Sequence, residues 1–100
     1  MSVVAYHFWN PTCGPCQHIK QSVEMLKQNF AEVKWESVNT HEDRKGLTVV
    51  HNVKIVPTIV VLVKDNNGKT LGGSRLTGID MMAYHRMIQG AVKAVSELPR

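Results

Sequence analysis

The sequence predicts a single α/β domain over residues 1–100, in which helices flank a four-stranded mixed sheet. Three observations carry this prediction. Runs of β-branched residues alternate with amphipathic helical patterns. The tetrapeptide Asp-Asn-Asn-Gly at 65–68 is a strong hairpin signal. A length of 100 residues, of which 43% are hydrophobic and 20% charged, suits one folded core. The expected order is β-α-β-α-β-β-α, and its leading strand–helix–strand unit implies a parallel pair with a right-handed crossover.

The first half of the chain alternates between strand and helix patterns. Residues 3–9 are nearly all apolar or aromatic, which predicts a strand buried on both faces. After a break at 10–12, one helical face is formed by Ile19, Val23, Leu26 and Phe30. A second strand is predicted over 33–39. Residues 40–43 then favour the start of a short helix, which we expect to end near 51–52, where Asn52 suits the left-handed conformation.

The second half predicts a hairpin followed by a helix. Residues 58–64 form a β-branched strand, and 69–77 return as its antiparallel partner, with a bulge expected at the paired glycines Gly72 and Gly73. Asp80 is a plausible N-cap for the last helix. The apolar stripe of that helix, which we expect to be core, consists of Met81, Tyr84, Ile88, Ala91, Val95 and Leu98.

The charge and hydropathy of the chain argue against nucleic acid or membrane as a partner. The net charge is +4, but the twelve Lys and Arg residues are scattered and form no basic run. The longest apolar run, 59–63, is far too short to span a bilayer. The N-terminus has no basic region before its apolar residues and is typical of a strand rather than a signal peptide. We therefore expect a cytoplasmic monomer.

Cys13 and Cys16 are the only cysteines, and two residues separate them. A disulfide across so short a loop constrains the unfolded chain little, so chemistry is a better explanation than bracing. A zinc site would need four ligands, and no histidine stands at a recognisable spacing from this pair. Covalent haem attachment needs a histidine directly after the second cysteine, where Gln17 stands. We expect no metal and no cofactor.

The two cysteines stand between a buried strand and a helix, where the unpaired N–H groups of the first turn stabilise a thiolate. We expect Cys13 to be exposed just before the turn and Cys16 to be shielded inside it. Pro15 fits an early helical position, and Gly14 leaves room for a substrate. Cys13 would attack a substrate disulfide to form a mixed disulfide, and Cys16 would then attack Cys13 and release the reduced substrate.

Two motifs resemble the thioredoxin family. Residues 8–16 read FWNPTCGPC, which is similar to the family's Phe-Trp-Ala-x-Trp-Cys-Gly-Pro-Cys signature. Residues 56–58 read VPT, similar to the family's cis-proline element, and Pro57 follows Cys13 by 44 positions, as expected for the family. The similarity covers essentially the whole chain. It implies a protein-disulfide oxidoreductase that acts on disulfide-containing proteins and is re-reduced by a thioredoxin reductase.

The resemblance also assigns roles around the cysteines. Pro57 would be cis and pack beside the disulfide, and the backbone of Val56 would pair with an extended substrate segment. Trp9 would pack under the active-site loop. Gly78, which falls where the family has a glycine after the last strand, would line the substrate groove.

Several positions depart from the family pattern. The chain starts at the strand before Cys13, so we expect a thioredoxin fold that lacks the leading strand and helix. His7 stands where the family has a buried acid behind Cys16; imidazole titrates near neutrality, so His7 could exchange the Cys16 proton, and a neutral structural histidine is the alternative. Thr12 replaces a family tryptophan, which predicts altered partner choice. Trp35 stands about where the family often has a lysine near that acid.

Two rival interpretations remain open at this stage. Glutaredoxins share the C-x-x-C motif, the cis proline, a late glycine and this size, and the glycine pair 72–73 is superficially similar to theirs. The Gly-Pro pair between the cysteines and the aromatic pair 8–9 favour thioredoxin instead. A non-catalytic binding module, such as a processivity subunit, is a second use of the same fold.

Overall fold

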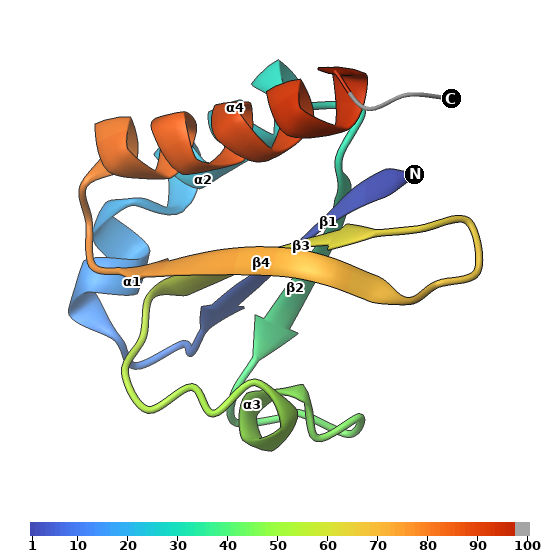
Figure 1. Ribbon diagram of the computed structural model, residues 1–100. Helices are drawn as coiled ribbons and strands as arrows, with labels where there is room; N and C mark the ends of the chain where they lie inside the picture. The colour runs from blue at the N-terminus through green and yellow to red at the C-terminus, as the bar shows by residue number, and fades with distance from the viewer. Residues whose placement is uncertain (98–100) are drawn as a thin grey trace.

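A computed structural model describes residues 1–97, and within them a four-stranded sheet has the strand order β2-β1-β3-β4 (Figure 1). The strands are β1 (Ser2–Trp9), β2 (Lys34–Asn39), β3 (Thr58–Lys64) and β4 (Thr70–Thr77). The helices are α1 (Gly14–His18), α2 (Lys20–Asn29), α3 (Leu47–Val50) and α4 (Met81–Glu97). β1 runs parallel to β2, and the other two strand pairs are antiparallel. The predicted mixed sheet flanked by helices is confirmed.

Helices α2 and α4 cover one face of the sheet, and α3 lies against the other (Figure 1). The larger core lies under α2 and α4 and includes Val3 and Ala5 of β1, together with Ile59 of β3. On the opposite face of β1, Phe8 is fully buried in a smaller cluster, whereas Val4 is only half-buried. The expected burial of β1 on both faces is therefore wrong for most of its length, because α3 is a single turn and shields little of that face.

The helical segment after the cysteines is divided at Ile19, whose φ of −100° and ψ of 4° separate α1 from α2. The expected single helix is therefore two helices, although the Ile19 N–H still donates to the Pro15 oxygen at 3.3 Å. The predicted apolar face is confirmed, since all four of its members, Ile19, Val23, Leu26 and Phe30, are buried.

The second predicted helix is shorter than the sequence indicates. Residues 40–46 form turns, so the expected start at 40–43 is wrong. The carboxylate of Asp43 instead accepts hydrogen bonds from the backbone N–H groups of Leu47, at 3.0 Å, and Thr48, at 2.7 Å. Asp43 thus lies outside α3 and accepts hydrogen bonds from N–H groups of its first turn, which have no partner within the helix. Asn52 has a φ of +51°, as predicted for the end of this helix.

The hairpin of β3 and β4 contains the predicted irregularity at a slightly different place. Val63 pairs with Gly72 while Lys64 pairs with Thr70, so the extra residue is Leu71 rather than a member of the glycine pair. Close packing explains the glycine at position 73. A Cβ atom there would lie 2.8 Å from both the carbonyl oxygen of Val61 and the side chain of Leu62.

The long helix α4 begins as the sequence predicts. The Asp80 carboxylate accepts a hydrogen bond from the Ala83 N–H at 3.1 Å, which is an N-cap. Tyr84 and Ile88 of its apolar stripe are fully buried, and Leu98 lies outside the described residues. No helix within residues 1–97 combines the length and apolar character needed to cross a membrane.

Candidate active site

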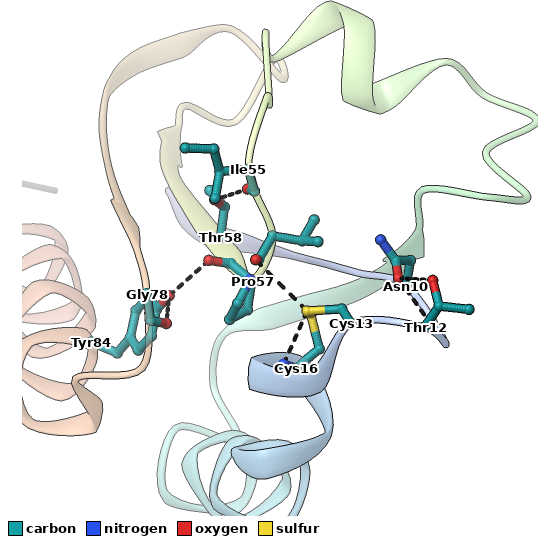
Figure 2. The surroundings of a disulfide bond; sticks show 10 residues. Asn10, Thr12, Cys13, Cys16, Ile55, Pro57, Thr58, Gly78 and Tyr84 are labelled. Atoms are coloured by element: carbon teal, nitrogen blue, oxygen red, sulfur yellow. Dashed lines mark hydrogen bonds between the residues drawn. A yellow bond between two sulfur atoms is a disulfide. The ribbon is translucent and has the colours of Figure 1, made fainter.

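The cysteines form a disulfide at the start of α1, where the turn after β1 ends (Figure 2). Cys13 is the N-cap of α1, and its Sγ accepts a hydrogen bond from the Cys16 N–H at 3.1 Å. Cys16 is only 3% exposed, whereas Cys13 is partly exposed. Pro15 occupies the first turn, and the space around Gly14 is open. The Cys13 sulfur is therefore the more accessible of the two, and the Cys16 sulfur is shielded.

Asn10 stabilises the turn that leads from β1 to the two cysteines. Its side-chain oxygen accepts hydrogen bonds from the backbone N–H of Thr12 at 3.0 Å and from the Thr12 hydroxyl at 3.1 Å. The Asn10 carbonyl oxygen also accepts from the Cys13 N–H at 3.3 Å. Side-chain turns of this kind redirect the backbone without help from the core. Thr12 is exposed next to Cys13 and presents a small polar surface there.

Pro57 lies beside the disulfide, and the peptide bond between Val56 and Pro57 is cis, as the resemblance implied (Figure 2). The Cys13 Sγ lies 3.7 Å from the carbonyl oxygen of Val56. The hydroxyl of Thr58 donates to the carbonyl oxygen of Ile55 at 2.6 Å and so holds the chain on either side of the proline. The backbone before Pro57 therefore lies next to the Cys13 sulfur.

A buried tyrosine joins the proline loop to the loop before α4. The Gly78 N–H donates to the Pro57 oxygen at 3.0 Å, and the Tyr84 hydroxyl donates to the Gly78 oxygen at 2.6 Å (Figure 2). The Pro57 oxygen lies 3.4 Å from the same hydroxyl. Gly78 has a φ of +118°, which a side chain would strain. Burial raises the pKa of Tyr84 to about 12, so its hydroxyl keeps its proton.

A cavity of about 80 Å³ lies behind the buried sulfur. Its walls include Cys16, His7 and Trp9, together with side chains from α2 and Ser37 of β2. The Trp9 Nε1 donates to the Ser37 hydroxyl at 2.8 Å, which fixes the indole as one wall. Most of the lining surface is apolar, but several polar side chains reach the cavity, and its volume is large enough for a water molecule. Cys16 therefore has a water-sized space behind it as well as its partner sulfur in front.

His7 lies where the sequence places it, on the cavity with Cys16. Its side chain is buried, with the residue 6% exposed, and its Nε2 has no hydrogen-bond partner within the described residues. The pKa of His7 is lowered to about 4, chiefly by burial and also by the positive charge of Lys27, while the negative charge of Glu24 opposes both. The expectation that His7 titrates near neutrality is therefore wrong, because its pKa lies well in the acid range and the imidazole is neutral at pH 7.

Sequence reasoning missed the charged wall of the cavity. Lys20 and Glu24 are exposed residues of α2 that also line the cavity with Cys16. The three residues follow one another at intervals of four, but the helix is divided at Ile19, so the sequence alone does not place them on one face. Trp35, by contrast, packs against the larger apolar core. The ionic groups near Cys16 therefore come from α2 rather than from the sheet.

Comparisons with known proteins agree with this geometry. A sequence model of the thioredoxin family, described as "Thioredoxin", matches residues 2–83. The chloroplastic M-type thioredoxin of Brassica napus is 33% identical over 72 residues, which cover 71% of this chain but only 40% of that protein. The thioredoxin of Griffithsia pacifica is 24% identical over 85 residues, or 82% of this chain and 77% of that protein.

A solved structure of a mutant thioredoxin from Halobacterium salinarum superposes with a TM-score of 0.74 at 25% identity, covering 99% of this chain and 79% of that one. The likeness therefore extends from sequence to the whole described fold. Because the family match spans most of the sequence, and the disulfide and the cis proline stand where the family motifs predict them, the chain belongs to the thioredoxin family.

Proposed function

We propose that this chain is a thiol–disulfide oxidoreductase that reduces disulfide bonds in other proteins. The observation that carries the proposal is the Cys13–Cys16 disulfide at the start of α1, with one sulfur accessible and the other buried. Two cysteines so arranged alternate between a dithiol and a disulfide without rearranging the fold. Membership of the thioredoxin family supports the same activity.

The chemistry proceeds in two exchanges. The Cys13 thiolate attacks one sulfur of a substrate disulfide, and the other substrate sulfur leaves with the bonding electrons and takes a proton. Cys16 then loses its proton and attacks Cys13, so the second substrate sulfur leaves as a thiolate. The substrate gains two electrons and the protein becomes a disulfide. The N–H of Cys16, 3.1 Å from the Cys13 Sγ, favours the thiolate of Cys13 over the thiol.

The substrate docks along the backbone beside Cys13. The Val56 carbonyl is within reach of Cys13, and an extended segment of a partner protein pairs with this backbone as an added strand. Trp9 and Gly78 flank the docked segment, and Thr12 with the Gly14–Pro15 pair forms its remaining border. Because Thr12 is small and polar, partner proteins are selected mainly by the backbone and less by apolar contact at this position.

His7 serves Cys16 as a neutral hydrogen-bonding group. Within residues 1–97 its Nε2 has no hydrogen-bond partner, His7 lines the cavity together with Cys16, and the low pKa disfavours a second proton on the imidazole. Outside the site, the proposed setting is a monomer in a reducing compartment such as the cytoplasm, where a disulfide is a catalytic intermediate rather than a brace. A thioredoxin reductase would restore the dithiol.

The direct test is the reduction of insulin disulfides by dithiothreitol, followed as turbidity, with and without the protein. We expect strong acceleration by the parent and none by Cys13→Ser. Cys16→Ser is the matched control, because it keeps the attacking sulfur but cannot complete turnover. A parent that does not accelerate the reaction contradicts the proposed function.

A further inference from the structure

In the second exchange, the buried thiol of Cys16 must lose its proton. Cys16 is 3% exposed, and a thiol must lose its proton before its sulfur attacks. The cavity lined by Cys16 is large enough for a water molecule, and polar side chains reach it. A side chain on the cavity that accepts the proton would make the buried sulfur reactive without exposing it to solvent.

Three titratable side chains line this cavity: His7 from β1, and Lys20 and Glu24 from α2. The ammonium group of Lys20 has donors and no acceptor. His7 has an acceptor nitrogen, but burial disfavours the imidazolium that would result. Glu24 offers two carboxylate oxygens, each of which accepts protons and hydrogen bonds. By chemistry, the carboxylate is the group of the three that is suited to take the proton.

Glu24 also connects the cavity to water. Its side chain is 61% exposed, whereas that of Lys27 is 22% exposed, and the Lys27 Nζ lies 3.2 Å from the Glu24 Oε1. The ion pair spans one turn of α2 and restrains the Glu24 carboxylate. Glu24 therefore touches the space behind Cys16 on one side and bulk solvent on the other.

We propose that Glu24 accepts the proton of Cys16 through the cavity and releases it to solvent, and that Lys27 is a positioning residue for this carboxylate. The inference rests on the proposed function. The S–H bond of Cys16 breaks and its proton passes to Glu24, through water where the groups do not touch. The Cys16 sulfur bonds to Cys13, and the substrate sulfur leaves with the electron pair. In the reductive half of the cycle the proton returns by the same route.

The experiment isolates the second exchange. One equivalent of the aromatic disulfide dithiobis(nitrobenzoate) reacts with the reduced protein and releases a coloured thiolate in two phases. The first phase is bimolecular and reports the attack by Cys13. The second is unimolecular and reports the attack by Cys16 on the mixed disulfide. Both rates are measured between about pH 5 and pH 9, a range that spans the ordinary pKa of a free thiol.

We expect Glu24→Gln to slow the second phase by about tenfold or more at the acid end, since general acid–base groups contribute about 10²–10⁴-fold. The deficit should shrink toward high pH, where hydroxide takes the proton directly, and the first phase should be unchanged. Glu24→Asp should restore most of the rate, and Lys27→Gln should show a smaller loss. Glu32→Gln is the matched control, because it removes the same charge from an exposed turn.

Two results would overturn the role of Glu24. One is a second-phase rate in Glu24→Gln that equals the parent's at every pH. The other is the same fractional loss at every pH, which a purely structural effect would give. Insulin reduction by the parent separates the test of the proposed function from the test of Glu24. If the parent reduces insulin and either of these results is found, only the proton-accepting role of Glu24 is contradicted. If the parent fails to reduce insulin, the proposed function itself is contradicted.

Discussion

The hydroxyl of Tyr84 lies 2.6 Å from the carbonyl oxygen of Gly78. Through this bond a buried residue of α4 holds the loop that faces the disulfide, and the Gly78 N–H in turn holds the Pro57 oxygen. A trans peptide points its C=O and the following N–H in opposite directions, so fixing the Gly78 oxygen also fixes the next peptide plane. The core of the molecule thereby sets the geometry of the cis-proline loop beside Cys13.

Tyr84→Phe removes this bond and keeps the ring. We expect the free energy of unfolding to fall by about 1–3 kcal/mol, because the buried Gly78 oxygen loses its donor. We also expect the KM for insulin to rise more than kcat falls, since docking depends on the loop and the sulfur chemistry does not. Urea denaturation and insulin kinetics measure the two effects. Dithiobis(nitrobenzoate), a small substrate, is the control, and equal losses on both substrates would count against this role.

The burial of His7 predicts how stability depends on pH. The pKa of an unfolded histidine is 6.5 and that of folded His7 is about 4, so between these values the unfolded chain binds more protons. Stability therefore falls as pH drops through this window and is unaffected by His7 above it. The full loss is about 3 kcal/mol, at 1.36 kcal/mol for each pKa unit.

His7→Leu should flatten this dependence, because it removes the titrating group and keeps an apolar side chain in the strand. Denaturation by urea at several pH values between about 4 and 7 compares the variant with the parent. The variant should lose less stability on acidification. Parallel curves for the two proteins would show that other groups cause the acid sensitivity.

Cys16→Ser should trap the protein on its substrate. The variant keeps the attacking sulfur at the N-cap of α1 but lacks the sulfur that resolves the mixed disulfide. Mass spectrometry of the variant after incubation with insulin should show a covalent adduct that dithiothreitol removes. Cys13→Ser, which lacks the accessible sulfur, should give little adduct. Equal adducts on both variants would contradict the assignment of Cys13 as the attacking residue.

Thr12→Trp should change which proteins are reduced rather than whether reduction occurs. Thr12 is exposed beside Cys13, so a tryptophan there adds apolar surface without entering the core. Rates with several disulfide proteins should change unequally, while the first phase with dithiobis(nitrobenzoate) stays within about twofold, as expected for a surface change that leaves both sulfurs and the first turn of α1 in place. Unchanged rates on every protein substrate would rule out a role for this position in partner choice.

Much of the fold follows from local patterns that tertiary contacts reinforce. The strand 58–64, the Asp80 cap and the left-handed Asn52 all lie where the sequence predicts, because each depends on its own few residues. The break at Ile19 could not be predicted, since no proline or glycine stands at that position. The late start of α3 follows Gly46, whose φ of +68° interrupts a helix that would begin at 40–43.

The site divides in the same way. Cys13, Cys16 and Pro57 were predicted because motif and spacing identify them. Glu24 was missed because its side chain is mostly exposed, and a charged helical residue is usually a solvated one. Only the cavity shows that this helix face meets the space behind Cys16. The low pKa of His7 likewise depends on burial, which sequence alone does not supply.

The most direct measurement is the stoichiometry of exchange between the reduced protein and insulin, with free thiols alkylated and counted by mass spectrometry. The proposed mechanism predicts that two insulin thiols appear for each protein molecule in which Cys13 and Cys16 become a disulfide, and that Cys13→Ser produces none. Insulin that gains no thiols, or gains them while both cysteines stay reduced, would contradict it.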